Sequence, residues 1–584
     1  MTVASRAFAA MLKVPPALTR DIVVERDVAI HAPDGTCLLT DVYLARSREP
    51  LPAILMRSPY GRRGPYGTMA RLFAERGYHV VLQSTRGTFG SGGQIDFDRE
   101  AGDGRSTADW IIGQDWSNGE IGGFGGSYLS FTQLALASTR PPQLKAMAIG
   151  TWGAERRASY YQGGSFALDR ALGWTYTICH QERPLAFVRT PLLARRELES
   201  AFAHLPLLDA DVLAAGQPVG FYRAWLEHDQ PGDPYWTPTD FRPLLRDLGI
   251  AVTMIAGWYD PFLPSMLADY QALRDGGQTA RLRVGGWHHT SQDLFRYAIR
   301  DALGWLDTHL RHQPPPSQAQ APAQAPTPAP APAPDLDLDP VPVPVSVRVE
   351  VMGGGGWRAL PRWPPPFSIQ RWHLQPAGVL ATAPPPACEP DRYRYDPADP
   401  TPAVGGTSIM NAGPRDNQAL ERRPDVLTYT SAPLATALEI AGPVTAELHV
   451  GSSSAHTDFF ARLCDVDPRG RSVNITDGLL RLTADGGLTA DGGLTADGGL
   501  TADGGLTADG DGPIRIDLWP TAHRFGPGHR IRLQISSGAH PRYARNPGTG
   551  EPLATATSLR AVEQAIHHDP PQPSAVLLPA TDAR

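Results

Sequence analysis

Ser127 is the residue whose surroundings most favour nucleophilic chemistry in this sequence. An apolar, glycine-rich run precedes it at 121–126, and an apolar, helix-compatible run follows at 131–136. Strand, sharp turn and helix in this order form a nucleophile elbow, in which the turn exposes the hydroxyl. Gly125 stands two positions before the serine, but Leu129 stands two positions after it, so the strict G-x-S-x-G pattern is not met. An ordinary glycine-rich turn before a helix is therefore the alternative interpretation.

A serine nucleophile needs a general base, and that base needs an orienting acid. The apolar run 251–259 delivers Asp260 just past its end, and the run 280–288 delivers His289. Both residues fall at the carboxyl ends of predicted strands, where open α/β sheets place their sites. The chain order Ser, Asp, His is that of α/β-hydrolases. We therefore predict a catalytic triad of Ser127, Asp260 and His289.

These residues lie in motifs that resemble those of the cocaine-esterase-type (CocE/NonD) serine hydrolases. That family is related to the X-prolyl dipeptidyl aminopeptidases and the α-amino-acid ester hydrolases. Its base motif, Gly-x-Trp-x-His, selects His289 over the neighbouring His288. The elbow motif departs from the family at Ser130, where a glycine is usual. The matching stretches are Gly-Gly-Ser-Tyr-Leu-Ser at 125–130, Gly-Trp-Tyr-Asp at 257–260 and Gly-Gly-Trp-His-His at 285–289.

The resemblance implies an oxyanion hole with one unusual donor. The backbone N–H of Tyr128, directly after the nucleophile, is one donor, and the hydroxyl of Tyr60 is the other. The chemistry agrees, because a phenol can donate a hydrogen bond and is neutral at pH 7. Without the resemblance, a tyrosine in the Pro-Tyr-Gly turn at 59–61 would be interpreted as a packed loop residue.

Strand-like and helix-like runs alternate through residues 22–149 and again through 250–312, which predicts a mostly parallel sheet covered on both faces. We therefore predict an α/β-hydrolase fold. Its core spans 1–149 and 247–312, with a helical cap inserted at 150–246, where no strand run occurs.

Beyond the predicted core the composition changes. Residues 313–344 repeat Ala and Pro and read as a semi-rigid polyproline linker. Residues 345–584 contain many short alternating runs with Gly and Pro turns, which predicts a β-sandwich, and the resemblance implies a jelly roll. Within it, Leu-Thr-Ala-Asp-Gly-Gly recurs in tandem across 482–511. We predict a flexible surface insertion, with a calcium-binding repeat as the alternative.

Composition excludes several classes of function. The 584-residue chain has a net charge of −7 and no basic stripe, so nucleic-acid binding is not expected. No apolar run reaches about 18 residues and the first 14 residues lack a secretion signal, so we expect no membrane partner. Four scattered cysteines predict reduced thiols in a cytoplasmic enzyme without a metal site, and nothing calls for a cofactor. The sequence leaves the oligomeric state undecided, and a homodimer formed through the sandwich is one alternative.

Three functions are compatible with these sequence features. The first is an esterase or amidase that cleaves a small acyl ester or amide through an acyl-enzyme. The second is an X-Pro dipeptidyl-peptidase, and the third a non-catalytic ligand-binding module, against which an intact triad argues. In amino-acid ester hydrolases an acidic pair closely follows the catalytic Asp, whereas Pro-Phe-Leu follows Asp260 here. We therefore expect an apolar acyl pocket walled by Phe262 and Trp174, although either residue could equally be ordinary core.

Overall fold

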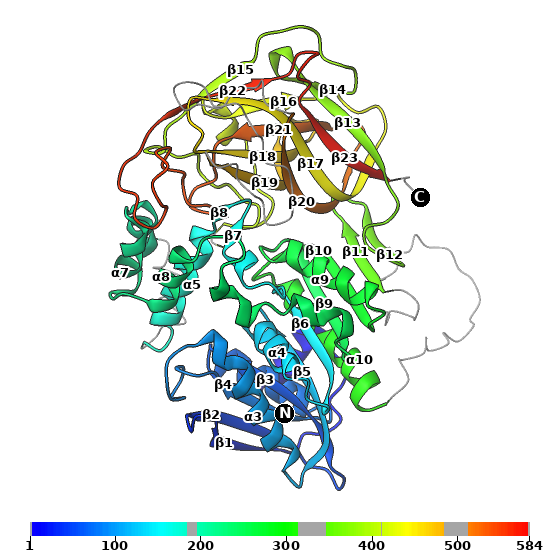
Figure 1. Ribbon diagram of the computed structural model, residues 1–584. Coiled ribbons are helices and arrows are strands. Elements are labelled where there is room, and N and C mark those ends of the chain that lie inside the picture. Colours follow the sequence, from blue (N-terminus) through cyan, green and yellow to red (C-terminus); the bar gives the residue numbers. More distant parts are fainter. Residues whose placement is uncertain (1–2, 184–195, 313–345, 410, 484–511, 582–584) are drawn as a thin grey trace, which may run out of the picture.

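The computed structural model describes residues 3–183, 196–312, 346–409, 411–483 and 512–581. These residues form a lower region of strands and helices and an upper region built almost entirely of strands (Figure 1). The predicted linker at 313–344 lies outside the described residues, as does nearly all of the predicted repeat insertion at 482–511.

The lower region is built on one mixed sheet in the order β1-β2-β4-β3-β5-β6-β9-β10-β11-β12. An antiparallel hairpin of β1 and β2 forms one edge, and the strands from β4 to β11 run parallel. This is the predicted α/β-hydrolase sheet. The strands are β1 (Ile22–His31), β2 (Cys37–Ala45), β3 (Leu51–Ser58), β4 (His79–Ser84), β5 (Ser117–Gly126), β6 (Leu144–Gly150), β9 (Ala251–Tyr259), β10 (Ala280–His288), β11 (Val347–Val351) and β12 (Gly356–Leu360).

Helices cover both faces of this sheet, because successive strand residues point to opposite sides. Along β3, Ile54 and Met56 join the core beneath α2 and α10, whereas Ala53 and Leu55 join the core beneath α3 and α4. Helix α4 is buried on nearly every side and therefore sits deep in the fold. The helices of the core are α1 (Val3–Leu12), α2 (Gly64–Ala74), α3 (Glu100–Ile112), α4 (Tyr128–Ser138), α9 (Leu263–Asp275) and α10 (Gln292–Leu310).

Strands β11 and β12 differ from the sequence-based expectation. We expected the strands after residue 345 to begin the sandwich, but β11 pairs in parallel with β10 and extends the hydrolase sheet. The alternating Val347, Val349 and Val351 are buried in the hydrolase core. Such a pattern fits the edge of either sheet, so pairing rather than local sequence decides where the strand lies.

The segment between β6 and β9 is largely helical, as predicted for the cap, and contains α5 (Leu168–His180), α7 (Ala210–Ala215) and α8 (Gly220–Glu227). It also contains a short hairpin of two strands with two residues each, β7 (Tyr161–Gln162) and β8 (Ser165–Phe166), although we expected no strands here. Gly163 at the hairpin tip lies against the sandwich, where a Cβ would sit 1.6 Å from the Leu479 carbonyl oxygen. The cap therefore contacts both regions.

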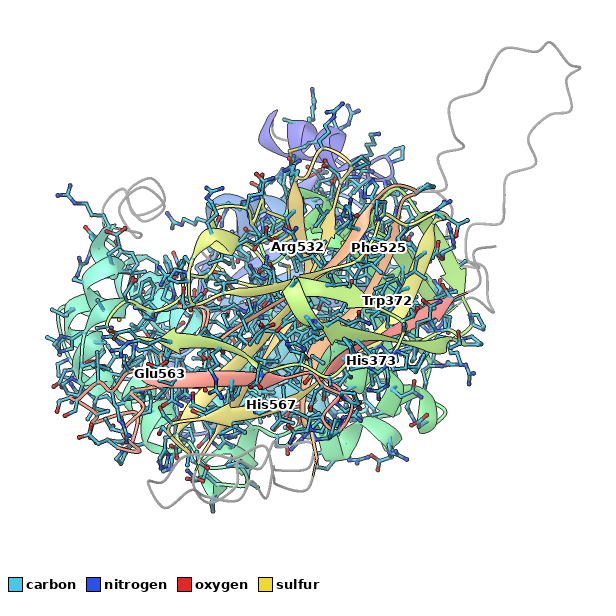
Figure 2. The ribbon with its side chains drawn as sticks, turned by 90° about the horizontal axis from the view of Figure 1, so that it is seen from above. Trp372, His373, Phe525, Arg532, Glu563 and His567 are labelled. Atoms are coloured by element: carbon cyan, nitrogen blue, oxygen red, sulfur yellow. The ribbon has the colours of Figure 1, made fainter. Side chains whose placement is uncertain are left out.

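The upper region is the expected all-β sandwich. Figure 2 looks down on it, with Glu563 and His567 labelled along one strand and Trp372 and His373 along another. Its core is aliphatic and aromatic and includes Leu448, Phe459 and Leu533. Its strands are β13 (Ser368–Gln375), β14 (Val379–Ala381), β15 (Asp391–Tyr395), β16 (Leu427–Thr430), β17 (Leu438–Ser452), β18 (Thr457–Val466), β19 (Ser472–Leu482), β20 (Ile514–Phe525), β21 (Arg530–Ser536), β22 (Val562–His567) and β23 (Ala575–Thr581).

Candidate active site

Ser127 occupies a strained turn between β5 and α4. Its φ of 58° and ψ of −129° lie in a region that non-glycine residues rarely adopt, and such strain clusters at functional sites. Gly125 is required two positions earlier, since a Cβ there would lie 2.3 Å from the Leu129 side chain. The Ser130 hydroxyl donates to the Gly125 carbonyl over 2.7 Å and accepts from the Gly150 N–H over 2.9 Å. A hydroxyl that ties β5 to β6 thus stands where the family pattern has glycine.

The structure brings Ser127, Asp260 and His289 together from three strand ends. The Nδ1 atom of His289 lies 2.8 Å from Asp260 Oδ2, and its Nε2 lies 3.2 Å from Ser127 Oγ. Asp260 is fully buried and also accepts the Phe262 N–H over 2.9 Å. An ionised carboxylate only accepts hydrogen bonds, so Nδ1 carries the imidazole proton and Nε2 presents its lone pair to the serine.

His288 takes part in a different set of contacts. Its N–H donates to Ser291 Oγ over 2.8 Å, and its ring nitrogen lies 3.3 Å from the Thr290 hydroxyl. Burial, followed by the charge of Arg415, lowers its pKa. Of the two neighbouring histidines, His289 is therefore the one hydrogen-bonded to Ser127.

Tyr60 lies in the turn after β3, and its hydroxyl interacts with both Trp174 and the Ser127 side chain. The indole Nε1 of Trp174 donates to the phenol oxygen over 3.2 Å. An indole N–H can only donate, so the phenol must accept here and its own hydrogen is free to point elsewhere. Burial raises the pKa of Tyr60, which keeps the phenol neutral and able to donate.

Tyr128 begins α4, so its backbone N–H has no acceptor inside the helix. Its hydroxyl donates to Glu100 Oε1 over 2.9 Å, and Arg57 Nη1 donates to Glu100 Oε2 over 2.6 Å. Burial raises the pKa values of Glu100 and Tyr128. This hydrogen bond from the Tyr128 phenol to Glu100, called here the phenol anchor, fixes the first turn of α4 and therefore the direction of the Tyr128 N–H.

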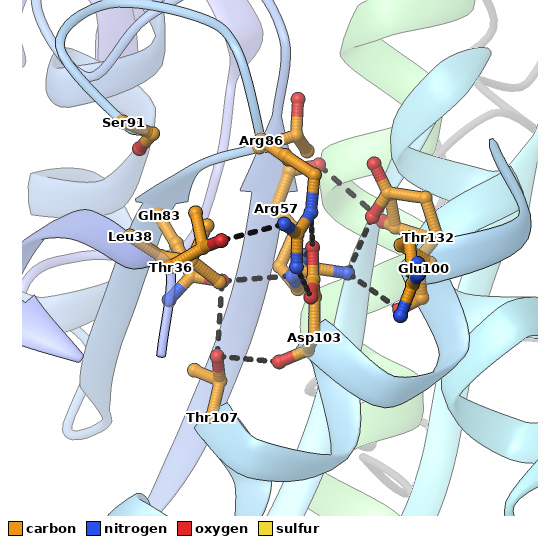
Figure 3. A network of polar contacts seen from close by, with 12 residues as sticks. Thr36, Leu38, Arg57, Gln83, Arg86, Ser91, Glu100, Asp103, Thr107 and Thr132 are labelled. Carbon is orange, nitrogen blue, oxygen red and sulfur yellow. Dashed lines mark hydrogen bonds and ion pairs between the residues drawn. The ribbon is translucent and has the colours of Figure 1, made fainter. Parts of the chain in front are cut away.

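The anchor belongs to a larger buried network that links α3 to the sheet (Figure 3). Arg57 also donates to Gln83 over 2.8 Å, and Arg86 donates to Asp103 over 2.7 Å and 3.0 Å. Sequence reasoning missed this network. A buried Arg in β3 and a buried Glu opening α3 carry no local signature, and only tertiary packing brings them together.

Aromatic rings lie beside several residues of the candidate site. The Phe262 ring centroid lies 5.4 Å from that of His289, and Trp174 stacks on Tyr128 at 5.9 Å with an angle of 6° between the ring planes. Phe221 packs on Trp174 at 5.1 Å, and both are only partly buried. Of the two predicted pocket walls, Phe262 therefore lies beside His289. Trp174 lies beside Tyr60 and Tyr128.

The described residues contain no group of three or more His, Cys, Asp or Glu side chains that could hold a metal ion. No helix in the described ranges is both long and apolar enough to cross a membrane.

Fold and site together define a serine hydrolase of the α/β-hydrolase class. A profile described as X-Pro dipeptidyl-peptidase (S15 family) matches residues 34–291. A second, described as the X-Pro dipeptidyl-peptidase C-terminal non-catalytic domain, matches residues 344–577. The chain is 31% identical over 611 aligned residues to cocaine esterase from Rhodococcus sp. (strain MB1 Bresler), covering 95% of this chain and 98% of that protein. The chain therefore belongs to the cocaine-esterase-type (CocE/NonD) family of S15 serine hydrolases.

Solved structures show the same two-region fold. An α-amino acid ester hydrolase superposes with a TM-score of 0.76 at 21% identity, over 97% of this chain and 98% of its own. A CocE/NonD family hydrolase from Staphylococcus aureus gives 0.64 at 17% identity, over 96% and 94%. Family membership makes this chain an enzyme rather than the non-catalytic binding module that was our third alternative.

Proposed function

We propose that this serine hydrolase is a carboxylesterase that cleaves esters of apolar, preferably aromatic, carboxylic acids through an acyl-enzyme on Ser127. The observation that carries the proposal is the position of His289, which bridges Asp260 and Ser127 at 2.8 Å and 3.2 Å. The 31% identity to cocaine esterase supports ester rather than peptide hydrolysis.

In the acylation step, Ser127 Oγ attacks the ester carbonyl carbon while His289 Nε2 takes the hydroxyl proton. The imidazolium formed is stabilised by the Asp260 carboxylate. Negative charge develops on the former carbonyl oxygen, where the Tyr60 hydroxyl and the Tyr128 N–H would donate to it. The intermediate collapses as His289 returns the proton to the departing alcohol, which leaves the acyl group on Ser127.

Deacylation repeats the sequence with water as the nucleophile. His289 takes a proton from the water, the same two donors stabilise the second oxyanion, and Ser127 leaves with the proton. The free acid and the resting enzyme are restored.

Aromatic side chains support the proposed acyl preference. Phe262 lies against His289, Trp174 lies beside Tyr60 and Tyr128, and Phe221 packs on Trp174, so an acyl group on Ser127 would meet rings. Stacked aromatic pairs contribute about 0.5–1.5 kcal/mol beyond area burial. Simple benzoyl esters are therefore expected to react faster than acetyl esters.

The alternative, an X-Pro dipeptidyl-peptidase, would need an anionic group to hold the substrate's α-ammonium. The cation Arg170 instead lies over the Phe262 ring, with 5.2 Å between the guanidinium carbon and the ring centroid. Arg170 is buried, and the carboxylate charges that act on it are that of Asp169 and, more weakly, that of Asp260. A cation beside the acyl site disfavours an ammonium there by direct repulsion.

A panel of p-nitrophenyl benzoate, p-nitrophenyl acetate and Gly-Pro-p-nitroanilide tests the proposal, with Ser127→Ala as the blank. We expect hydrolysis of both esters, a higher kcat/KM for the benzoate, and no release from the anilide. Faster release from Gly-Pro-p-nitroanilide than from either ester would establish the peptidase alternative.

We also propose the cytoplasm as the location. Cys37, Cys179, Cys388 and Cys464 are all free thiols, as expected in a reducing compartment. Cell fractionation of the native host, with thiol trapping before lysis, tests this proposal.

A further inference from the structure

The sandwich carries a second relay of nucleophile, imidazole and carboxylate. Strand β15 begins at Asp391, which pairs with Ile566 of β22. Strand β22 ends at His567, labelled in Figure 2, so His568 follows directly, and Cys388 lies three residues before Asp391. The Cys388 Sγ atom lies 3.2 Å from His568 Nδ1, and His568 Nε2 lies 3.0 Å from Asp391 Oδ2.

The carboxylate fixes the protonation of the imidazole. Asp391 Oδ2 accepts from the Tyr429 hydroxyl over 2.7 Å and from His568 Nε2. A carboxylate only accepts, so Nε2 carries the proton and Nδ1 presents its lone pair to the thiol. The arrangement repeats that of Ser127, His289 and Asp260 with the two ring nitrogens exchanged. The imidazole of His568, which would act as the base, is buried, because its side chain is only 1% exposed.

The thiol itself is reachable from solvent. Cys388 is partly exposed and lies between the exposed residues Ala387 and Glu389. Burial, followed by the charges of Asp569, Asp391 and Glu389, raises its pKa. The thiol is therefore protonated at rest, and it needs the neighbouring imidazole to accept its proton when it attacks.

We infer that Cys388 is a covalent modification site, at which His568 assists the thiol in attacking neutral or cationic small disulfides and similar soft sulfur electrophiles. The Cys388 sulfur attacks one sulfur of the disulfide R–S–S–R, and His568 Nδ1 takes the thiol proton. A new bond forms between Cys388 and one sulfur as the old S–S bond breaks. The released thiolate RS⁻ then takes up the proton as RSH. Two electrons pass from Cys388 to the departing sulfur, so no further oxidant is needed.

The charge around the thiol sets the choice of electrophile. Glu389, Asp391 and Asp569 place negative charge close to Cys388. An anionic reagent is repelled from this surface and a cationic one is concentrated at it, which changes encounter rates by about tenfold or more.

The remaining cysteines serve as internal controls. Cys37 and Cys179 are partly exposed, like Cys388, but within the part of the chain that the structure describes neither thiol is hydrogen-bonded to an imidazole. Cys464 is fully buried, and burial raises its pKa to about 12.

The test measures modification rates at each cysteine of the full-length protein by quenching and peptide mass mapping. Three methanethiosulfonates are used: the cationic trimethylammonioethyl, the neutral methyl and the anionic sulfonatoethyl reagents. With the neutral reagent we expect Cys388 to react at least about tenfold faster than Cys37 or Cys179. At Cys388 the cationic reagent should be faster than the anionic one by about tenfold. Equal neutral-reagent rates at Cys388 and Cys179 would overturn the inference.

Variants separate base assistance from simple exposure. His568→Gln should slow neutral labelling of Cys388 by about a hundredfold while leaving Cys37 unchanged. If this variant does not fold, Asp391→Asn, which removes the orienting carboxylate but keeps its size, should slow the same reaction. An unchanged rate in a folded variant refutes the role of His568. In Ser127→Ala, Cys388 should be modified at the same rate as in the parent. The outcome therefore does not depend on the proposed esterase activity.

Discussion

The indole Nε1 of Trp174 donates to the hydroxyl oxygen of Tyr60 over 3.2 Å, which joins cap helix α5 to the turn after β3. Because the indole occupies a lone pair of the phenol oxygen, the phenol hydrogen is left for Ser127 or for an oxyanion. A residue that we predicted only as a pocket wall is thereby positioned to orient Tyr60, the proposed second oxyanion donor.

Replacing Trp174 by Phe should keep an aromatic wall and remove this hydrogen bond. Since one such bond contributes about 0.5–1.5 kcal/mol, kcat on a p-nitrophenyl ester should fall about two- to thirteenfold with little change in KM. The same change made in a Tyr60→Phe background should lower kcat little further, because the group it orients is already gone. Fully additive losses in this double-mutant cycle would show that Trp174 acts only as a wall.

Tyr60→Phe removes one proposed oxyanion donor and very little volume. The donor acts mainly in the transition state, so kcat should fall by about 10²–10³-fold while KM changes little. Tyr66→Phe is the matched control, since Tyr66 stacks on Tyr60 at 5.9 Å but belongs to no proposed step. Steady-state kinetics measure kcat of both variants on p-nitrophenyl acetate. A kcat of Tyr60→Phe close to that of Tyr66→Phe would show that Tyr60 is not an oxyanion donor.

Substitutions at the two neighbouring histidines should differ sharply. His289→Ala removes the proposed base and should lower kcat about as much as Ser127→Ala, by about 10⁶-fold. His288→Ala should keep most of the activity, because its ring contacts Thr290 rather than the serine. A fluorophosphonate probe, resolved by peptide mapping, should label Ser127 alone in the parent. A strong loss in His288→Ala with activity retained in His289→Ala would reverse the assignment.

The sequence predicted the strands and the elbow well because each depends on local signals. The hairpin turn at Asp34 and Gly35 joins β1 to β2 as expected, and the glycines before Ser127 mark a turn that larger residues could not enter. These signals lie within a few residues of the features they specify.

What the sequence did not predict depends on contacts between distant segments. Glu100 contacts Tyr128 only after α3 and α4 pack together, and nothing in the sequence near either residue indicates this contact. Likewise β11 has the alternation of any half-buried strand, and its partner β10 is far along the chain. The hairpin at Gly163 depends on the close approach of Leu479 from the sandwich.

Asp269 gives a prediction about stability and pH. This carboxyl group of α9 is buried and accepts the Ala154 N–H over 2.6 Å. Burial raises its pKa from 3.8 to about 7. The folded protein therefore holds a proton that the unfolded chain releases near pH 4. The stabilisation linked to that proton is complete below about pH 4 and is lost as pH rises to about 7, at up to about 1.4 kcal/mol per pH unit.

Asp269→Asn should remove this pH dependence, because the amide keeps an acceptor for Ala154 and cannot ionise. Urea unfolding at half-unit steps from pH 4.5 to 8 measures the effect. Relative to the Asn variant, the parent's free energy of unfolding should fall up to about pH 7 and then stay level. Asp275→Asn, at an exposed position of the same helix, is the matched control and should leave the profile of the parent unchanged. Parallel profiles for the parent and Asp269→Asn would show that Asp269 is ionised throughout this range.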